Sequence, residues 1–93
     1  MIASFATQAT RLVFEGEFAK SLPNQIQAIA RRKLRMVANA ERIDDLRIPP
    51  NNRLELLKGT RSGQHSIRIN DQWRVCLVWR AGQAHEVEIC DTH

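Results

Sequence analysis

The residues most able to do chemistry in this chain are its arginines and a few scattered acid–base side chains. Eleven of the fourteen basic residues are arginine, and the formal net charge is +4. A guanidinium presents a planar set of donors that can bind a phosphate through two hydrogen bonds. This composition indicates a polyanionic partner, with RNA or DNA as the first candidates, or alternatively no more than a soluble basic surface.

The cysteines and histidines do not indicate a metal centre. Their spacing matches no common zinc motif, so we expect neither a metal nor a cofactor. Cys76 and Cys90 are predicted to be small buried apolar residues with reduced thiols rather than a disulfide, which fits a cytoplasmic protein. The five residues concerned are Cys76, Cys90, His65, His85 and His93.

The length and hydropathy of the chain predict one domain over residues 1–93. No apolar run approaches the roughly 20 residues that a membrane span needs. The opening residues lack the charged region and the long apolar stretch of a signal peptide. We therefore expect a cytoplasmic protein that does not enter a membrane.

The N-terminal half is patterned as helices. Residues 1–5 can form a short strand that joins a later sheet, and residues 8–20 predict a short helix that Gly16 weakens or ends. The clearest helix is predicted to start with Ser21 as its N-cap and Pro23 in its first turn. Its apolar residues then recur at helical spacing from Ile26 to Val37.

Basic residues accompany this helix, and a shorter helix is predicted after it. Arg31, Arg32 and Arg35 fall off the apolar stripe and, with Lys33, predict a basic face toward solvent or a partner. A third helix is expected over residues 40–46, before the prolines at 49 and 50 end it.

From residue 53 onward, apolar residues recur at every second position rather than at helical spacing. Residues 65–69, 73–79 and 87–90 alternate between apolar and polar positions, with turn signals between them. This pattern predicts a three-stranded antiparallel meander with one apolar face, which the helix over residues 26–37 can cover, and thus an α+β fold. The alternation directs Arg74 away from Trp73 and Val75, out of the core, and puts His65 on the core face or at its rim.

Four segments, in their order and spacing, resemble the HigB toxins of the RelE/ParE toxin superfamily. No single motif is specific, but together they cover essentially the whole chain. They are residues 1–5 (MIASF), 53–59 (RLELLKG), 65–74 (HSIRINDQWR) and 91–93 (DTH).

The resemblance implies a fold, an activity and partners. The fold would be RelE-like, with two to three N-terminal helices packed on a small antiparallel β-sheet. The protein would be the toxin of a type II toxin–antitoxin system, an endoribonuclease that needs no metal and cleaves mRNA in the ribosomal decoding site. Its partner would be a HigA-type helix-turn-helix antitoxin, through which alone it would reach operator DNA.

The resemblance also suggests how five residues could cleave RNA. The reaction needs a base for the attacking 2′-OH, an acid for the leaving 5′-oxygen and cations for the phosphate. Arg74 matches the arginine that contacts the scissile phosphate, and Lys58 matches the site lysine. We hypothesise Glu55 as base and His93 as acid, or the reverse. Asp91 orients His93 or a nearby arginine, or is structural.

Each of these assignments has a plainer alternative. Arg74 is then an ordinary strand arginine, Lys58 a solvated loop lysine and His93 part of a frayed terminus. The sequence also departs from the family, since Thr92 replaces its tyrosine and Glu55 replaces its histidine. These departures predict a weak or conditional toxin.

Basic residues outside the candidate site are expected to contact ribosomal RNA phosphates. Two other functions stay open because fold does not determine function. One is a non-catalytic toxin of the superfamily, such as a ParE-like gyrase inhibitor, and the other is an attenuated toxin that binds RNA without cleaving it. The candidate RNA-binding residues are Arg31, Arg32, Arg35, Arg53 and Arg61.

Overall fold

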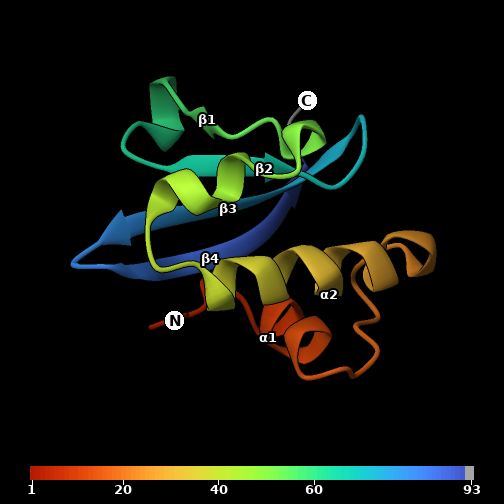
Figure 1. Cartoon of the computed structure of the whole chain (residues 1–93). Helices are drawn as coiled ribbons and strands as arrows, with labels where there is room; N and C mark the ends of the chain where they lie inside the picture. Colours follow the sequence, from red (N-terminus) through yellow and green to blue (C-terminus); the bar gives the residue numbers. More distant parts are fainter. Residues whose placement is uncertain (92–93) are drawn as a thin grey trace.

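The computed structural model describes residues 1–91, in which two helices lie against one face of an antiparallel sheet (Figure 1). The helices are α1 (Gln8–Phe14) and α2 (Asn24–Asn39). The strands lie side by side in chain order, β1-β2-β3-β4. The predicted α+β class is confirmed, and the sheet has one strand more than the predicted meander. Its strands are β1 (Glu55–Leu56), β2 (His65–Arg68), β3 (Trp73–Arg80) and β4 (Gln83–Asp91).

Helix α1 is shorter than the predicted range of 8–20. Its N-cap is Thr7, whose side chain accepts a hydrogen bond from the Thr10 backbone N–H at 3.2 Å. It ends at Phe14, and Gly16 then takes a φ of +85°, a left-handed conformation that glycine adopts without strain. Residues 15–20 are therefore a loop.

Helix α2 begins after Pro23, and the prediction of Ser21 as its N-cap was wrong. No side chain caps this end of the helix. The buried side chain of Gln27 instead ties the preceding loop to the helix, because its amide bonds both the N–H and the carbonyl of Ala19 and also the carbonyl of Leu22. The predicted apolar stripe is confirmed, since Ile26, Ala30, Leu34 and Val37 are buried. Neither α1 nor α2 is long and apolar enough to span a membrane.

The third predicted helix is not α-helical. Two short 3₁₀ helices follow α2, η1 (Ile43–Arg47) and η2 (Pro50–Asn52). The carboxylate of Asp45 accepts backbone hydrogen bonds from Glu41 and Arg42 at 2.9 and 3.1 Å. These bonds hold the pKa of Asp45 below its usual range, because they stabilise the charged form.

Lys33 does not belong to the basic face predicted for α2. It is buried, and its Nζ donates to Oδ1 of Asn52, a fully buried residue that donates in turn to the Leu46 carbonyl. The helical period predicts an exposed ammonium group at Lys33. That group is instead buried, because the buried amide of Asn52 accepts its hydrogen bond. Burial lowers the pKa of Lys33, and the charges of Arg32 and Arg68 lower it further.

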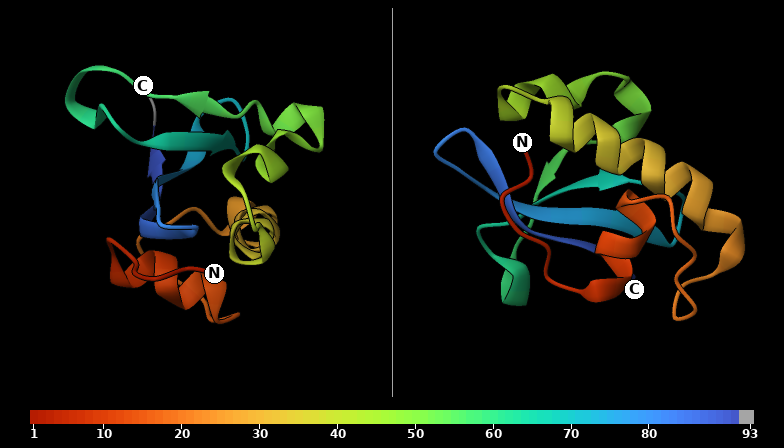
Figure 2. Two further views of the ribbon diagram at one scale, coloured as in Figure 1. Left: turned by 60° about the vertical axis from the view of Figure 1, so that its left-hand side comes forward. Right: turned by 90° about the horizontal axis from the view of Figure 1, so that it is seen from below.

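The apolar face of the sheet lies under the two helices (Figure 2). Ile67, Val75 and Ile89 are directly opposite one another across β2, β3 and β4, and all three are buried. The N-terminal segment runs beside β4 through parallel bridges at Ile2 and Phe5. The prediction that it joins the sheet is thereby confirmed, although only as isolated bridges.

The expectation of two free thiols is not met. Cys76 and Cys90 are buried, as predicted, but a disulfide joins them. The register places Cys90 opposite Arg74 and Cys76 opposite Glu88, so the two cysteines are diagonal neighbours on one face, with Cα atoms 6.7 Å apart. Only the register of β3 and β4 brings together residues that are 14 positions apart.

Candidate active site

The sheet face that the helices leave uncovered carries polar side chains. Glu55, Ser66, Cys76 and Glu88 form one row across the four strands, each directly opposite the next. The neighbouring row on this face contains Arg68, Arg74 and Cys90. Because side chains alternate along a strand, these rows point away from the helices. We call this surface the open face.

Two hydrogen bonds hold the side chain of Arg74 on the open face. Its Nε donates to Ser66 Oγ at 2.7 Å, and a terminal nitrogen donates to the backbone carbonyl of Arg53 at 2.7 Å. Only 13% of the Arg74 side chain is exposed. A guanidinium has five N–H donors, so these two bonds fix its plane while three donors stay available for a ligand.

The backbone at Arg53 explains how its carbonyl reaches Arg74. Arg53 follows η2 with φ +48° and ψ +57°, a left-handed conformation that is uncommon for residues other than glycine. In this conformation the chain turns between η2 and β1. The contribution of Arg53 to the site is therefore its main chain, while its own side chain is exposed.

Charges of both signs surround Arg74. Burial lowers the pKa of its guanidinium, Arg68 and Arg53 lower it further, and the carboxylate of Glu55 opposes them. The group nevertheless stays protonated, because arginine titrates far above physiological pH. Oε1 of Glu55 lies 4.0 Å from the Arg74 terminal nitrogen. In such a pair, the guanidinium can bind a phosphate, and the carboxylate can accept a proton from a neighbouring hydroxyl.

The structure therefore brings two of the five predicted catalytic residues together, Glu55 and Arg74. Lys58 is exposed at the start of the 3₁₀ helix η3 (Gly59–Arg61), and no hydrogen bond or ion pair holds its side chain within residues 1–91. Asp91 is paired in register with Trp73 and accepts a hydrogen bond from Gln72 at 2.9 Å. Strand alternation directs Asp91 to the side of Trp73 rather than that of Arg74.

The fifth predicted catalytic residue, His93, lies outside the described residues, as does Thr92, which replaces the family tyrosine. In the part of the chain that is described, no three His, Cys, Asp or Glu side chains are placed to hold a metal ion. His65 lies at the rim of the core, as predicted, with a buried Nδ1.

The predicted RNA-binding arginines fall into two groups. Arg61 lies on the side of the open face, where it pairs with Glu88 at 3.2 Å and is 34% exposed. Arg32 and Arg35 are exposed on α2, on the opposite side of the sheet. Arg31 is only partly exposed, because its guanidinium packs over Gly16. The basic residues predicted as one RNA-binding set thus occupy two sides of the molecule.

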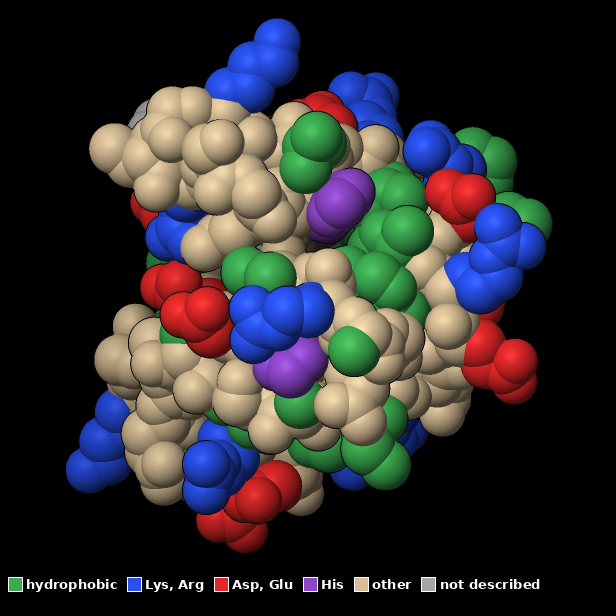
Figure 3. All heavy atoms as spheres, turned by 90° about the vertical axis from the view of Figure 1, so that its left-hand side faces the viewer, with side chains coloured by type: hydrophobic (Ala, Val, Ile, Leu, Met, Phe, Trp, Pro, Cys, Tyr) green, Lys and Arg blue, Asp and Glu red, His purple; other side chains and the backbone are tan. Residues whose placement is uncertain are grey.

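Charges of both signs are interspersed on the side of the molecule where β3 turns into β4 (Figure 3). Acidic and basic side chains are close neighbours there, with apolar side chains between them. The net positive charge of the chain therefore does not form one uninterrupted basic surface on this side.

Ser66 is a site residue that the sequence analysis did not single out. It is fully buried, and its hydroxyl accepts the hydrogen bond from Arg74 Nε. The signal was present, because Ser66 alternates with the apolar Ile67 and so shares a face with Arg74. Its contact with Arg74 depends on the register of β2 and β3, which alternation alone does not provide.

A family model and a curated relative indicate the same toxin family. The family described as "RelE-like toxin of type II toxin-antitoxin system HigB" matches residues 3–93. Toxin HigB-1 of Vibrio cholerae serotype O1 is 43% identical over 63 residues, which cover 68% of this chain and 66% of that toxin. An uncharacterized protein of Haemophilus influenzae is 38% identical over 65 residues, which cover 70% of this chain and 62% of that protein. The matches thus span slightly less than two thirds of either relative.

A solved structure has the same fold. The YoeB-YefM complex from Staphylococcus aureus contains a chain that superposes with a TM-score of 0.61, covering 100% of this chain and 98% of that one. The sequence identity is 13%, so this likeness concerns the fold alone.

Proposed function

The chain belongs to the HigB-like family of RelE-like toxins of type II toxin–antitoxin systems, and from this premise we propose that it is an endoribonuclease that cleaves mRNA on the ribosome. The observation that carries the proposal is the fixed guanidinium of Arg74, with the Glu55 carboxylate 4.0 Å away on the open face. The buried side of the sheet has no comparable pair of charges within the described residues.

In the proposed reaction, Glu55 accepts the proton of a ribose 2′-OH. The 2′-oxygen attacks the adjacent phosphorus, the bond to the 5′-oxygen breaks, and the products are a 2′,3′-cyclic phosphate and a 5′-hydroxyl. Arg74 stabilises the charge that builds on the non-bridging oxygens, and the acid, His93, gives its proton to the leaving 5′-oxygen. The roles of Glu55 and His93 can also be reversed. In either case the chain's own groups supply both the proton transfers and the cation.

Two further residues of the site have supporting roles in the proposal. Lys58 is exposed and unpaired within residues 1–91, so it can move toward the phosphate and add positive charge. Asp91 accepts a hydrogen bond from Gln72 and precedes Thr92 and His93, so it can hold the end of β4 in place. An orienting role toward His93 would act through this position.

Recognition of the ribosome is assigned to the arginines outside the site. Arg32 and Arg35 are exposed on α2, Arg53 is exposed near the site, and Arg31 contributes from the edge of α2. Arg61 contributes less, because it is already paired with Glu88. Because phosphate contacts release counterions, affinity for ribosomes should fall steeply as salt increases. An affinity that does not change with salt would contradict this assignment.

The proposed setting follows from the substrate. Ribosomes and mRNA place the toxin in the cytoplasm, and the expected partner is a HigA-type helix-turn-helix antitoxin. Operator DNA would be contacted only through that antitoxin.

The test is an assay of mRNA cleavage in a reconstituted translation system, with 5′ ends mapped by primer extension, with and without ribosomes. Wild type should give ribosome-dependent cuts. Arg74→Ala should lower cleavage by about 100-fold or more, since it removes the fixed cation. Glu55→Gln should lower it by about 100-fold, since it removes the base. Arg80→Ala is the matched control, because Arg80 is exposed at the other end of β3, and this variant should cleave like wild type.

The remaining outcomes separate parts of the proposal. Full cleavage by Glu55→Gln would show that Glu55 is not the base, and full cleavage by His93→Ala would leave Glu55 as the main acid–base group. No cuts by wild type at any concentration would overturn the nuclease. RNA binding without cleavage would then identify an attenuated toxin, for which the replacement of the family tyrosine by Thr92 is the relevant observation. Inhibition of gyrase would identify a ParE-like toxin.

A further inference from the structure

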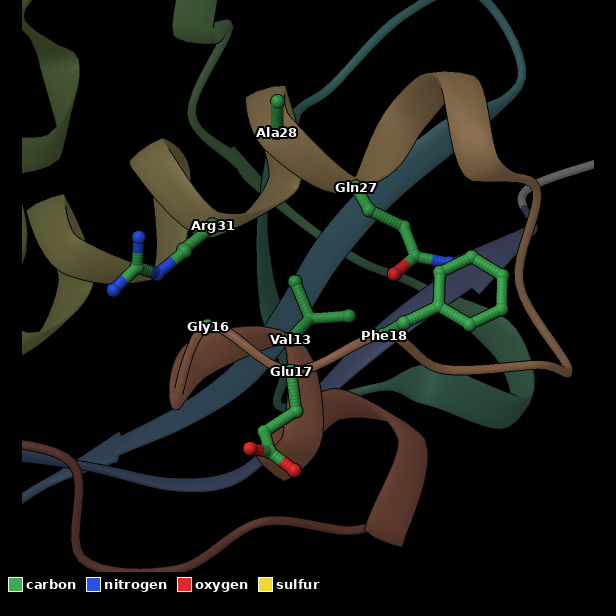
Figure 4. A pocket seen from close by; sticks show the side chains of 7 residues that line it. All are labelled: Val13, Gly16, Glu17, Phe18, Gln27, Ala28 and Arg31. Atoms are coloured by element: carbon green, nitrogen blue, oxygen red, sulfur yellow. The ribbon is translucent and has the colours of Figure 1, made fainter.

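The loop between α1 and α2 presents an aromatic side chain between two hollows. Phe18 is 59% exposed. On one side lies a hollow of about 230 Å³, whose lining includes Val13, Ala28 and Arg31 (Figure 4). On the other side lies a hollow of about 420 Å³, whose lining includes Leu12. Both hollows share Phe18 as a wall, so together they form one surface, which we call the Phe18 surface.

Hydrogen bonds fix the backbone on both sides of Phe18. Ala19, the residue after Phe18, is buried, and the Gln27 side chain bonds both its N–H and its carbonyl, at 3.1 and 2.8 Å. The N–H of Glu17, the residue before Phe18, donates to the Leu12 carbonyl at 2.8 Å. An exposed aromatic residue on a fixed loop loses little conformational entropy when a partner covers it. Such residues are enriched among the anchors of protein interfaces.

Arg31 adds a charge that nothing in the described chain neutralises. Its guanidinium packs against Gly16, where an added Cβ would lie only 3.0 Å from a terminal nitrogen. Its Nε is buried and has no hydrogen-bond partner within residues 1–91, and no carboxylate there forms an ion pair with it. Glu17 lines the same hollow, but its carboxylate points away from Arg31 (Figure 4). Arg31 lines the hollow and is partly exposed, so its guanidinium can pair there with a carboxylate that a partner supplies.

We propose that the Phe18 surface binds the antitoxin, through a segment with apolar side chains on either side of Phe18 and a carboxylate that pairs with Arg31. Lys20 at the second hollow favours the same sign of charge in the partner. This inference rests on the family, since a type II toxin has an antitoxin. The surface lies on the helix side of the sheet, opposite the open face that carries Arg74 (Figure 2). Antitoxin binding and RNA cleavage can therefore be changed by separate substitutions.

The experiment measures binding of the purified full-length chain to the antitoxin encoded beside its gene, by titration calorimetry. Phe18→Ser removes the aromatic anchor. Ala28→Glu places a carboxylate one helical turn before Arg31, where it would occupy the guanidinium and repel an acidic partner. Each variant should weaken antitoxin binding by about tenfold or more. The matched controls are Gln25→Glu, which adds the same charge nearer the start of α2, and Leu56→Ser, which removes an exposed apolar residue from the edge strand β1. Both controls should change affinity by less than about threefold.

Other outcomes would overturn this inference. Wild-type affinity of Phe18→Ser and Ala28→Glu, or a larger loss with Leu56→Ser, would place the antitoxin elsewhere. If light scattering shows that the chain alone is a dimer that Phe18→Ser dissociates, the occupant is a second copy and not the antitoxin.

Cleavage by Phe18→Ser, measured in the same translation assay, separates this inference from the nuclease proposal. We expect Phe18→Ser to cleave mRNA as fast as wild type does. The antitoxin should inhibit this variant less strongly than it inhibits wild type. Antitoxin binding through Phe18 by a chain that never cleaves RNA would support this inference and leave the nuclease proposal as the one that failed.

Discussion

The two faces of the β-sheet are built from the same strands and have opposite characters. On the face under the helices, Ile67, Val75 and Ile89 form an apolar row. One residue along each strand, the open face carries Ser66 and Arg74 among polar neighbours. The alternation of side chains along a strand separates the residues that stabilise this small domain from those proposed to do its chemistry.

The two faces are also held in order by different forces. The helix side is ordered by close packing of apolar side chains, which contributes most of the stability of a small domain. The open face is ordered by the Cys76–Cys90 disulfide and by hydrogen bonds and ion pairs, as between Arg74 and Ser66 or between Arg61 and Glu88. Substitutions on the helix side should therefore unfold the protein, whereas substitutions on the open face should change its activity.

The largest effect is expected from Leu77→Ala. Leu77 is fully buried on β3, and its truncation leaves a cavity that the core can only partly fill. We expect the free energy of unfolding, measured with urea, to fall by about 2–5 kcal/mol. Arg80→Ala on the same strand should change it by less than about 0.5 kcal/mol. A loss below about 1 kcal/mol for Leu77→Ala would show that the packed face is not the source of stability.

A smaller effect, on activity rather than on folding, is expected from Ser66→Ala. The alanine keeps the packing but removes the acceptor that fixes Arg74 Nε, so cleavage should fall about tenfold. The same substitution should have no effect in an Arg74→Ala background, because a positioning residue acts only through the group that it holds. Equal losses in both backgrounds would mean that Ser66 acts independently of Arg74. A loss of stability as large as that of Leu77→Ala would assign Ser66 to the core.

The smallest effect concerns Lys33, the only charged residue of the described chain that is buried. Its pKa in the folded state lies below the ordinary value of 10.5, mainly because of burial. The unfolded state therefore binds more protons between these two values, and folding becomes more favourable as the pH rises through that window. From pH 7 to 10, the unfolding free energy of wild type should rise relative to that of Lys33→Met. Lys20→Met, which removes an exposed lysine, should show no such change. A difference that is constant with pH would mean that burial does not perturb Lys33.

Much of the helix side could be predicted from sequence, and much less of the open face. The period of the apolar residues identified α2 and strands β2, β3 and β4, but not β1, because burial imposes a regular spacing of apolar residues along a chain segment. The same reasoning failed for Lys33, which the helical period places outside, because Asn52, 19 residues later, provides an internal partner. It also failed for the cysteines, whose pairing depends on the register of β3 and β4.

The candidate site shows the same division. The family likeness and strand alternation selected Arg74, and the resemblance selected Glu55. Their separation of 4.0 Å follows from the pairing of β1 with β2 and of β2 with β3. Ser66 and Arg53 lie within segments that resemble the family, but the motifs do not indicate that a Ser66 hydroxyl and an Arg53 carbonyl accept hydrogen bonds from Arg74.

The sequence by itself determined the α+β class, the toxin family and the face of the strand on which Arg74 lies. These properties depend on residue types and on spacings along the chain. The tertiary structure alone decided which groups meet: Arg74 with Ser66 and Glu55, Lys33 with Asn52, and Cys76 with Cys90. The physical reason is that strand register and loop paths are set by contacts between distant segments, and a local pattern carries little information about such contacts.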